Sequence, residues 1–184
     1  MFGIYLFLAI IAFVVFSIIA IYNKLVRGKN LVAEGWSGID VQLKRRTDLI
    51  PNLLESVKGY MSHERGLLSE VTRLRSESMQ IKDVKTKSQV ENALSRSLAS
   101  LFAVAENYPD LKANQNFLDL QKQLGEIEDQ IQMSRRYYNG TVRNFNILIE
   151  SFPSNLIARQ FNFTQASFFE LESETDRAVP QVSF

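Results

Sequence analysis

The residue pair that most suggests acid–base or metal chemistry is His63 with Glu64. A metal or proton-transfer site needs several converging ligands, and the 184-residue chain has one histidine and no cysteine. We therefore expect His63 to be a surface residue beside a glutamate on the helix seam. The acidic residues Glu126, Glu128 and Asp129 lie within about one helical turn, and an exposed helix face accounts for them.

Motifs of catalytic and cofactor sites are absent from the sequence. It contains no Gly-x-Gly-x-x-Gly, no phosphate-binding P-loop and no Gly-x-Ser-x-Gly. The lack of cysteine excludes disulfides, thiol catalysis and a bacterial lipoprotein anchor. We expect a non-enzymatic protein with no catalytic, cofactor-binding or metal-binding residues and no small-molecule substrate.

The charges are nearly balanced. There are 21 Lys and Arg against 20 Asp and Glu, a formal net charge of +1, so no overall positive field attracts nucleic acid. Residues 23–46 are locally basic, with six basic and two acidic residues. Near an anionic leaflet, Lys24, Arg27 and Lys29 can each contribute about 1 kcal/mol to membrane binding. Helix solvation and pairing along the seam account for residues 44–46, and we expect no nucleic-acid partner.

Residues 2–22 carry no charge. As a helix they are about 31 Å long at ~1.5 Å per residue, which matches a hydrocarbon core of roughly 30 Å. A buried soluble helix would show one polar face, and a cleaved signal peptide would have a basic start, a shorter apolar run and a small-residue cleavage site. The sequence therefore predicts a retained single-pass transmembrane anchor in contact with membrane lipid.

The flanks of this segment predict its orientation. Only Met1 precedes it, whereas Lys24, Arg27 and Lys29 follow it. Basic residues beside a span favour the cytoplasmic side. We expect a protein of the bacterial inner membrane, with its amino terminus outside and its bundle in the cytoplasm.

Apolar residues after position 36 recur at spacings of three and four, which is typical of helices that pack like coiled coils. The sequence predicts an all-α fold, in which the transmembrane helix continues into a long antiparallel three-helix bundle. The helices are expected near 23–79, 87–107 and 116–152. The two clearest seams are Trp36, Leu43, Ile50, Val57 and Val71 with Ile39, Leu53, Tyr60, Leu67 and Leu74, and Phe117, Leu124, Ile131, Tyr138, Phe145 and Phe152 with Leu120, Ile127 and Leu148.

Local signals refine these helices. The stretches that begin at Thr86 and at Ser88 resemble capping boxes, which place the start of the second helix there. Pro51 lies inside a seam that continues on both sides, so we expect a kink rather than a break. The unbroken heptad predicts that Asn139-Gly140 is helix interior, at a modest cost in stability.

The helix lengths leave two arrangements open. If residues 108–115 are extended, the third helix begins beside residue 40, runs parallel to the first and covers it. Otherwise another subunit covers the membrane-proximal seam. The first arrangement places Arg46 near Gln123 and Glu126, which gives this seam arginine the carboxylate partner that burial demands.

The predicted domains are an anchor at 1–22, a helical bundle at 23–160 and an aromatic and acidic tail at 161–184. We expect the rings of the tail to dock on the bundle, because so many exposed rings would promote aggregation. The alternative is a tail that binds a partner and orders on contact. The residues concerned are Phe161, Phe163, Phe168, Phe169 and Phe184, with Glu170, Glu172, Glu174 and Asp176.

Several stretches resemble the bacterial LemA family, over essentially the whole chain. The most specific is WSGIDVQLKRRTDLIPNL at 36–53, which continues through Val57-Lys-Gly-Tyr60 to His63-Glu64. Others are YNKLV at 22–26, LKANQNFL at 111–118, SRRYYN at 134–139, FPSNL at 152–156, Phe168-Phe169 and the ending PQVSF. Gly35, Gly38 and Gly140 stand where the family commonly has larger residues. The resemblance gives these candidates for family-signature or interaction residues: Trp36, Arg45, Arg46, Asp48, Pro51, Asn52, Tyr60 and Glu64.

The resemblance implies a membrane anchor, a helical bundle and no known enzymatic activity. Family members are often encoded near a membrane zinc metalloprotease of the heat-shock type, and one relative takes part in magnetosome formation. Our leading hypothesis is a non-enzymatic membrane scaffold or adaptor, which forms a homo-oligomer, binds a membrane partner such as that protease, or does both. The alternative is a membrane-shaping protein that oligomerises laterally and bends the bilayer.

Overall fold

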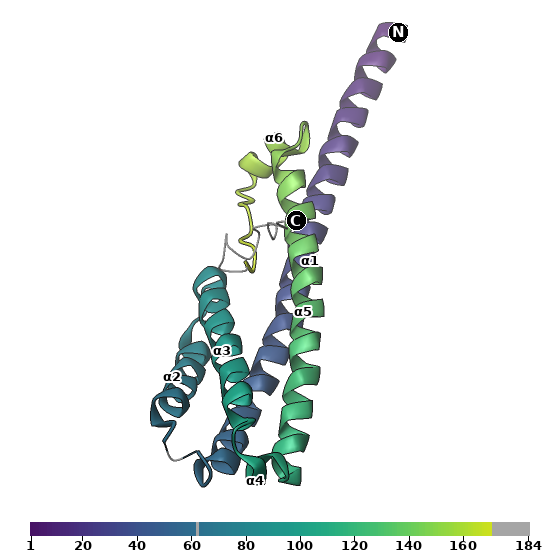
Figure 1. The fold of residues 1–184 in the computed structure, drawn as a ribbon. Helices are drawn as coiled ribbons and strands as arrows, with labels where there is room; N and C mark the ends of the chain where they lie inside the picture. Colours follow the sequence, from purple (N-terminus) through teal and green to yellow (C-terminus); the bar gives the residue numbers. More distant parts are fainter. Residues whose placement is uncertain (62, 171–184) are drawn as a thin grey trace, which may run out of the picture. The chain divides into compact units, whose positions relative to one another are not determined.

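A computed structural model describes residues 1–61 and 63–170. All regular secondary structure in these residues is helical, which confirms the all-α prediction. The helices are α1 (Phe2–Lys58), α2 (Arg65–Gln80), α3 (Val84–Ala105), α4 (Pro109–Lys112), α5 (Gln115–Glu150) and α6 (Ser154–Gln160) (Figure 1). They form two compact units: unit 1 is Met1–Gly38 with Arg136–Ser167, and unit 2 is Ile39–Arg135 with the residues from Phe168 onward.

Unit 2 is a bundle of helical segments around one apolar core. It contains the end of α1, the neighbouring pair α2 and α3, the short α4 and the start of α5 (Figure 1). Each of these helices places buried apolar side chains in the core, and removing that surface from water stabilises the bundle. The core residues are Ile50, Leu53, Val57, Met61, Val71, Leu74, Val90, Leu94, Leu98, Leu101, Ala105, Leu111, Phe117 and Leu124.

The prediction of one helix over 23–79 is wrong, because the chain turns between α1 and α2. Helix α1 ends just before Gly59, and the amides of Tyr60 and Met61 both donate to the Val57 carbonyl. The fully buried Met61 side chain joins the core at this turn. The spacing of the seam residues does not reveal such a turn, because the helices before and after the turn face the same core and carry the same apolar period.

Helix α5 runs antiparallel to α1, so the arrangement with a parallel third helix is wrong. Within unit 1, the rings of Trp36 and Tyr138 have centroids 5.7 Å apart, and Leu25 clusters with Phe145. The prediction lacked the turn after α1, which reverses the direction of the chain once more. The chain before α5 also reverses through α4 instead of running extended. The seam is covered within one chain: Leu43, for example, is 1% exposed.

The local signals were partly correct. Pro51 lies inside α1, so the helix does not break there, and Asn139-Gly140 lies inside α5 as predicted. The capping boxes from Thr86 and Ser88 are wrong, because α3 begins earlier with Asp83 as its N-cap. The Asp83 carboxylate accepts the Thr86 amide at 2.8 Å, which satisfies one of the free N–H groups of the first turn.

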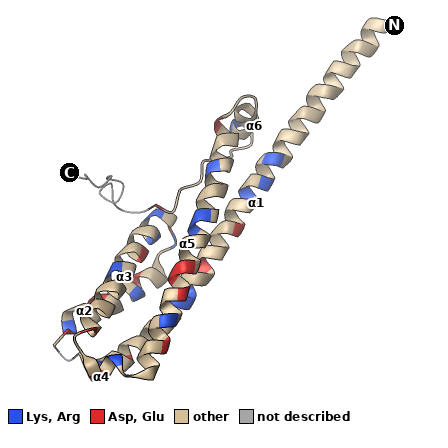
Figure 2. Ribbon diagram, turned by 45° about the vertical axis from the view of Figure 1, so that its right-hand side comes forward, with Lys and Arg blue, Asp and Glu red and all other residues tan. Residues whose placement is uncertain are grey.

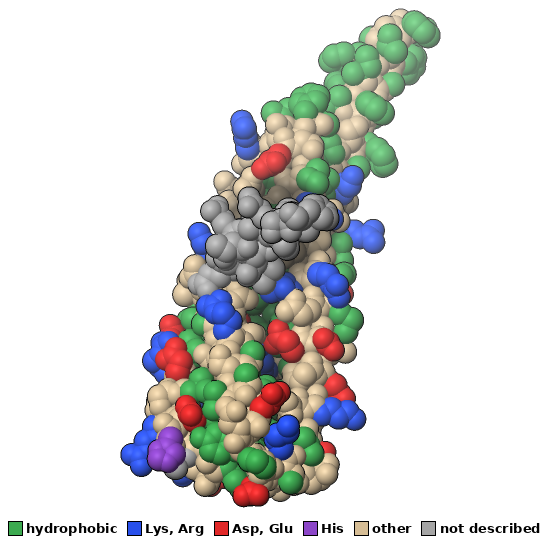
Figure 3. Space-filling model, viewed as in Figure 1, with side chains coloured by type: hydrophobic (Ala, Val, Ile, Leu, Met, Phe, Trp, Pro, Cys, Tyr) green, Lys and Arg blue, Asp and Glu red, His purple; other side chains and the backbone are tan. Residues whose placement is uncertain are grey.

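Unit 1 combines the beginning of α1 with the end of α5, α6 and the segment up to Ser167. Buried Leu25, Phe145 and Ala158 form one apolar cluster in this unit. In residues 2–22 of α1 the apolar side chains are largely exposed (Figure 3), and no Lys, Arg, Asp or Glu is present (Figure 2). With a mean hydropathy of 3.0 in its most apolar window, α1 is long and apolar enough to cross a membrane.

Some aromatic rings in the described part of the tail pack on the helices. In unit 1, the rings of Phe161 and Phe163 have centroids 4.8 and 5.9 Å from that of Tyr22. In unit 2, Phe169 is 1% exposed. The docked arrangement therefore holds for Phe163 and Phe169, whereas Phe161 and Phe168 are 51% and 37% exposed. The other tail residues of the prediction lie outside the described residues: Glu172, Glu174, Asp176 and Phe184.

Candidate functional site

The side chain of Arg46 is buried in unit 2. Helix α1 directs it into the bundle, where it is 1% exposed. An unpaired charge in such a place costs several kcal/mol, so the guanidinium needs carboxylate partners and hydrogen-bond acceptors. Helices α3 and α5 supply both.

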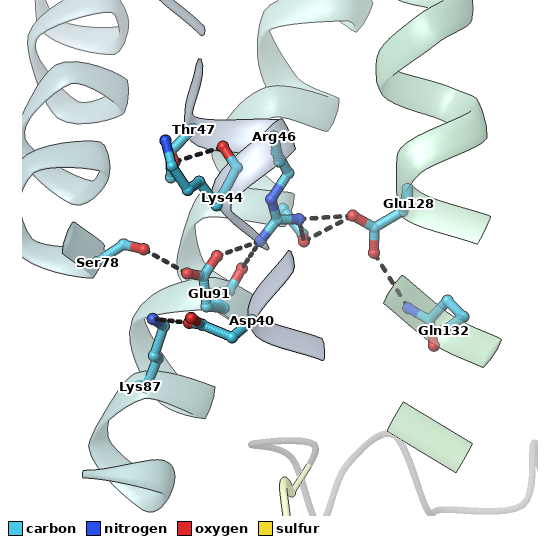
Figure 4. A network of polar contacts seen from close by, with 10 residues as sticks. Asp40, Lys44, Arg46, Thr47, Ser78, Lys87, Glu91, Glu128 and Gln132 are labelled. Carbon is cyan, nitrogen blue, oxygen red and sulfur yellow. Dashed lines mark hydrogen bonds and ion pairs between the residues drawn. The ribbon is translucent and has the colours of Figure 1, made fainter. Parts of the chain in front are cut away.

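Two carboxylates hold this guanidinium (Figure 4). Its Nη1 donates to Glu128 Oε2 and to Ser95 Oγ, each at 2.6 Å. Its Nη2 donates to the Glu91 carboxylate and, at 3.2 Å, to the Glu91 carbonyl. The Glu91 side chain is 2% exposed, whereas that of Glu128 is 36% exposed. The ion pairs therefore extend from the core to the surface of unit 2.

Further hydrogen bonds orient the two carboxylates. Ser78 of α2 donates to Glu91, and Gln132 Nε2 donates to Glu128 Oε1 at 3.1 Å (Figure 4). Through these bonds, α1, α2, α3 and α5 meet around one guanidinium. We call Arg46, Ser78, Glu91, Ser95, Glu128 and Gln132 the arginine network.

The prediction that Arg46 has a carboxylate partner is confirmed, but its predicted neighbours Gln123 and Glu126 are wrong. Those two residues line a separate groove. Because α5 is antiparallel to α1, Glu128 comes to the guanidinium instead, and α3 adds Glu91.

Sequence reasoning missed Glu91 and Ser78, although both carry a signal. Glu91 lies seven residues before Leu98, and Ser78 lies seven residues after Val71, so each occupies a seam position. A carboxylate on one apolar face and an arginine on another indicate a buried ion pair. Their spacing does not tell which helices bring them together.

The arginine network is suited to holding helices in place. Both Nη atoms of Arg46 are engaged in charge-assisted hydrogen bonds, while its buried Nε has no partner in the described part of the chain. His63 lies exposed in the turn before α2. Among residues 1–61 and 63–170, no group of three or more His, Asp or Glu side chains is placed to hold a metal ion.

The grooves on unit 2 include two that α5 lines. The apolar groove, of about 560 Å³, borders the arginine network between α3 and α5. The polar groove, of about 410 Å³, lies between α1 and α5. The apolar groove is lined by Arg46, Ser95, Arg96, Leu98, Ala99, Phe102, Gln121, Leu124, Gly125 and Glu128, and the polar groove by Gln42, Arg45, Asp48, Leu49, Gln123, Glu126, Ile127 and Gln130.

The eight signature candidates do not gather in one site. Arg45 and Asp48 line the polar groove, whereas Arg46 points into the core. Trp36 belongs to unit 1, where its ring packs on that of Tyr138. The other four are exposed or half-buried near the end of α1 and in the turn before α2: Pro51, Asn52, Tyr60 and Glu64.

Hydrogen bonds or burial shift the pKa values of Glu70, Asp83 and Tyr138. Hydrogen bonds from Arg73 hold the pKa of the Glu70 carboxyl below its usual value. Hydrogen bonds from Thr86 lower the pKa of Asp83. Burial raises the pKa of Tyr138 in unit 1.

Comparison with known proteins assigns the chain to a family. The LemA family profile matches residues 35–184. Protein LemA of Metamycoplasma hominis is 31% identical over 157 residues, which cover 84% of this chain and 71% of that protein. Magnetosome protein MamQ 2 of Paramagnetospirillum magneticum is 22% identical over 94% of this chain and 72% of its own length. Magnetosome protein MamQ of Magnetospirillum gryphiswaldense is 21% identical over 95% and 74%, respectively.

These similarities, together with the exposed apolar segment of α1, indicate a membrane-associated helical protein. The family match covers most of the chain, including the arginine network and both grooves. The chain belongs to the LemA family.

Proposed function

We propose that this protein is a non-enzymatic, single-pass membrane protein that presents its helical bundle as a scaffold or adaptor. The observation that carries the proposal is that α1 runs as one helix from the apolar segment into the core of unit 2, with no linker. A tether of this kind keeps the bundle beside the membrane. Basic residues Lys24, Arg27 and Lys29, just after the apolar segment, favour a cytoplasmic bundle in a bacterial inner membrane.

The apolar groove is our candidate for the surface that receives a partner. Its walls include buried Leu98 and Leu124, and the small residues Ala99 and Gly125 stand open to solvent between them. Apolar surface rimmed by polar residues is typical of protein interaction sites. The partner is a second copy of the chain or a membrane protein, such as a metalloprotease of the heat-shock type.

Photo-crosslinking in intact membranes tests this proposal. A photoreactive amino acid is placed at Ala99 in the apolar groove and, as the control, at Lys122, which is exposed on α5 but does not line that groove. We expect mass spectrometry to identify a second copy or a membrane protein joined to position 99 and neither at 122. A chain that stays single at both positions contradicts the scaffold.

Membrane shaping is the second candidate. The similarity to relatives named magnetosome proteins, over 94% and 95% of this chain, favours a role in organising membranes. Many copies packed side by side would then bend the bilayer. Electron microscopy of the purified protein in liposomes distinguishes the two candidates, because flat vesicles with only small complexes would exclude membrane shaping.

A further inference from the structure

Exposed apolar side chains surround α6 in unit 1. Phe152 is 80% exposed, Leu156 is 55% exposed and Phe161 is 51% exposed. All three lie within residues 152–161, a stretch that includes the whole of α6. Large exposed apolar side chains gathered in this way mark a surface that contacts a membrane or another protein.

The buried side of α6 fixes its position along α1. Ala158 is fully buried and lies in one cluster with Leu25, and Ile21 packs on the same cluster. Helix α6 therefore lies against the part of α1 where the uncharged run ends and Lys24 introduces the first charge.

The aromatic contacts of Tyr22 give the same position. Tyr22 is the last residue of the proposed span 2–22, whose helical length of about 31 Å matches a hydrocarbon core. When residues 2–22 span the bilayer, Tyr22 lies at the membrane–water interface, where tyrosine is enriched. The Phe161 ring is 4.8 Å from the Tyr22 ring, centroid to centroid, so it lies at the same level of the bilayer.

We propose that residues 152–161 form a second membrane contact, in which Phe152, Leu156 and Phe161 enter the interfacial layer of the bilayer that holds residues 2–22. This inference rests on the proposed membrane span. It adds that α6 docks on lipid beside the span. The exposed Arg159 of α6 and Lys24 of α1 then lie at the level of the headgroups, where anionic lipids attract them.

Lipid is the occupant that the contacts favour. The contacts between α6 and residues 21–25 are made within the chain itself, so they bring the apolar side chains to the membrane boundary without any other protein. A second copy covering the same side chains is an outcome that the test below distinguishes.

Single spin labels test the proposal in the full-length protein. The chain contains no cysteine, so each cysteine variant carries one label. Phe152→Cys and Leu156→Cys are labelled with a nitroxide, and the protein is reconstituted in vesicles of phosphatidylcholine and phosphatidylglycerol. Accessibility to oxygen, which concentrates in lipid, is compared with accessibility to a water-soluble nickel chelate.

Tyr137→Cys is the matched control. Tyr137 is 51% exposed, as Phe161 is, and its ring lies beside Gly35 of α1. Gly35 follows Tyr22 by thirteen residues, or about 20 Å of helix. We expect the nickel accessibility of labels at 152 and 156 to be several-fold lower than at 137, and their oxygen accessibility to be higher.

A label at Val14→Cys separates the two proposals. If the label at 14 is in lipid while those at 152 and 156 are as open to nickel as the label at 137, the membrane contact of α6 is overturned and the membrane span stands. If the label at 14 is in water, both fail. A third result would be that labels at 152 and 156 are shielded from both reagents and show spin–spin broadening that disappears on dilution with unlabelled chain. That result would place a second copy on α6 and overturn the lipid contact.

Discussion

Arg46 carries a positive charge into the core of unit 2, where Glu91 and Glu128 neutralise it. A buried ion pair contributes little more than a well-packed apolar replacement, but the loss of one partner leaves the other charge buried and unpaired. The arginine network therefore favours one arrangement of α1, α2, α3 and α5 over others that bury the same apolar surface.

Replacing Arg46 tests this role. We expect Arg46→Met to lower the free energy of unfolding by about 3–5 kcal/mol, because Glu91 is left buried without its cation. The measurement is urea denaturation of the detergent-solubilised protein. The control is Arg45→Met, at an exposed neighbouring position, which should change stability by about 0.5 kcal/mol or less. Equal stability of the two variants would contradict the role given to the network.

The N-cap of α3 makes stability depend on pH. Hydrogen bonds from Thr86 hold the pKa of Asp83 below its ordinary value of 3.8. Because the folded pKa is the lower one, the charged cap stabilises the fold above that ordinary value, and the contribution is lost as the pH falls through the folded pKa.

Asp83→Asn keeps a capping side chain that does not titrate. The stability of the wild type relative to this variant should therefore decrease as the pH is lowered below 3.8. Thermal unfolding of both proteins, followed by circular dichroism at a series of pH values, measures the difference. A difference that is constant down to the lowest pH would show that the Asp83 charge does not stabilise the cap.

At the scale of the elements, α1 and α5 approach closely in unit 1. A Cβ added at Gly35 would lie 3.2 Å from the Cα of Tyr138, whereas one added at Gly140 meets nothing within 4 Å in the described part of the chain. Both glycines lie inside helices. The two glycines share the same low helix propensity but differ in how closely a neighbouring helix packs against them.

The two glycines therefore predict opposite effects for the same substitution. Gly35→Ala should destabilise the protein by about 1–3 kcal/mol, because the backbone of α5 has to move. Gly140→Ala should stabilise it by about 0.5–1 kcal/mol, since alanine favours the helix. Thermal unfolding in the same detergent compares the variants. A stabilising Gly35→Ala would disprove the close approach.

The helix periodicity predicted α5 through Asn139-Gly140, because one uninterrupted seam faces α1 along it. It did not predict the turn after α1, since the seam resumes in α2 with the same period. The arginine network was predicted only in part for a related reason. The spacing of apolar residues around Arg46 shows that this side chain faces a core. Its pairing with Glu91 depends on how α1 and α3 align, and the spacing within one helix carries no information about that alignment.

At the scale of the whole molecule, α1 contributes to both compact units. Its apolar part is exposed, and its last part supplies Ile50, Leu53 and Val57 to the bundle core. The proposed scaffold depends on this continuity, because a chain cleaved after the apolar segment would leave its bundle without a tether.

The mass and extraction behaviour of the protein in native membranes test this central claim most directly. The account predicts that the mature chain keeps residues 2–22, as mass spectrometry would show, and that it stays in the membrane fraction after alkaline carbonate washing. A mature chain that lacks residues 2–22, or an intact chain that the wash releases, would contradict it.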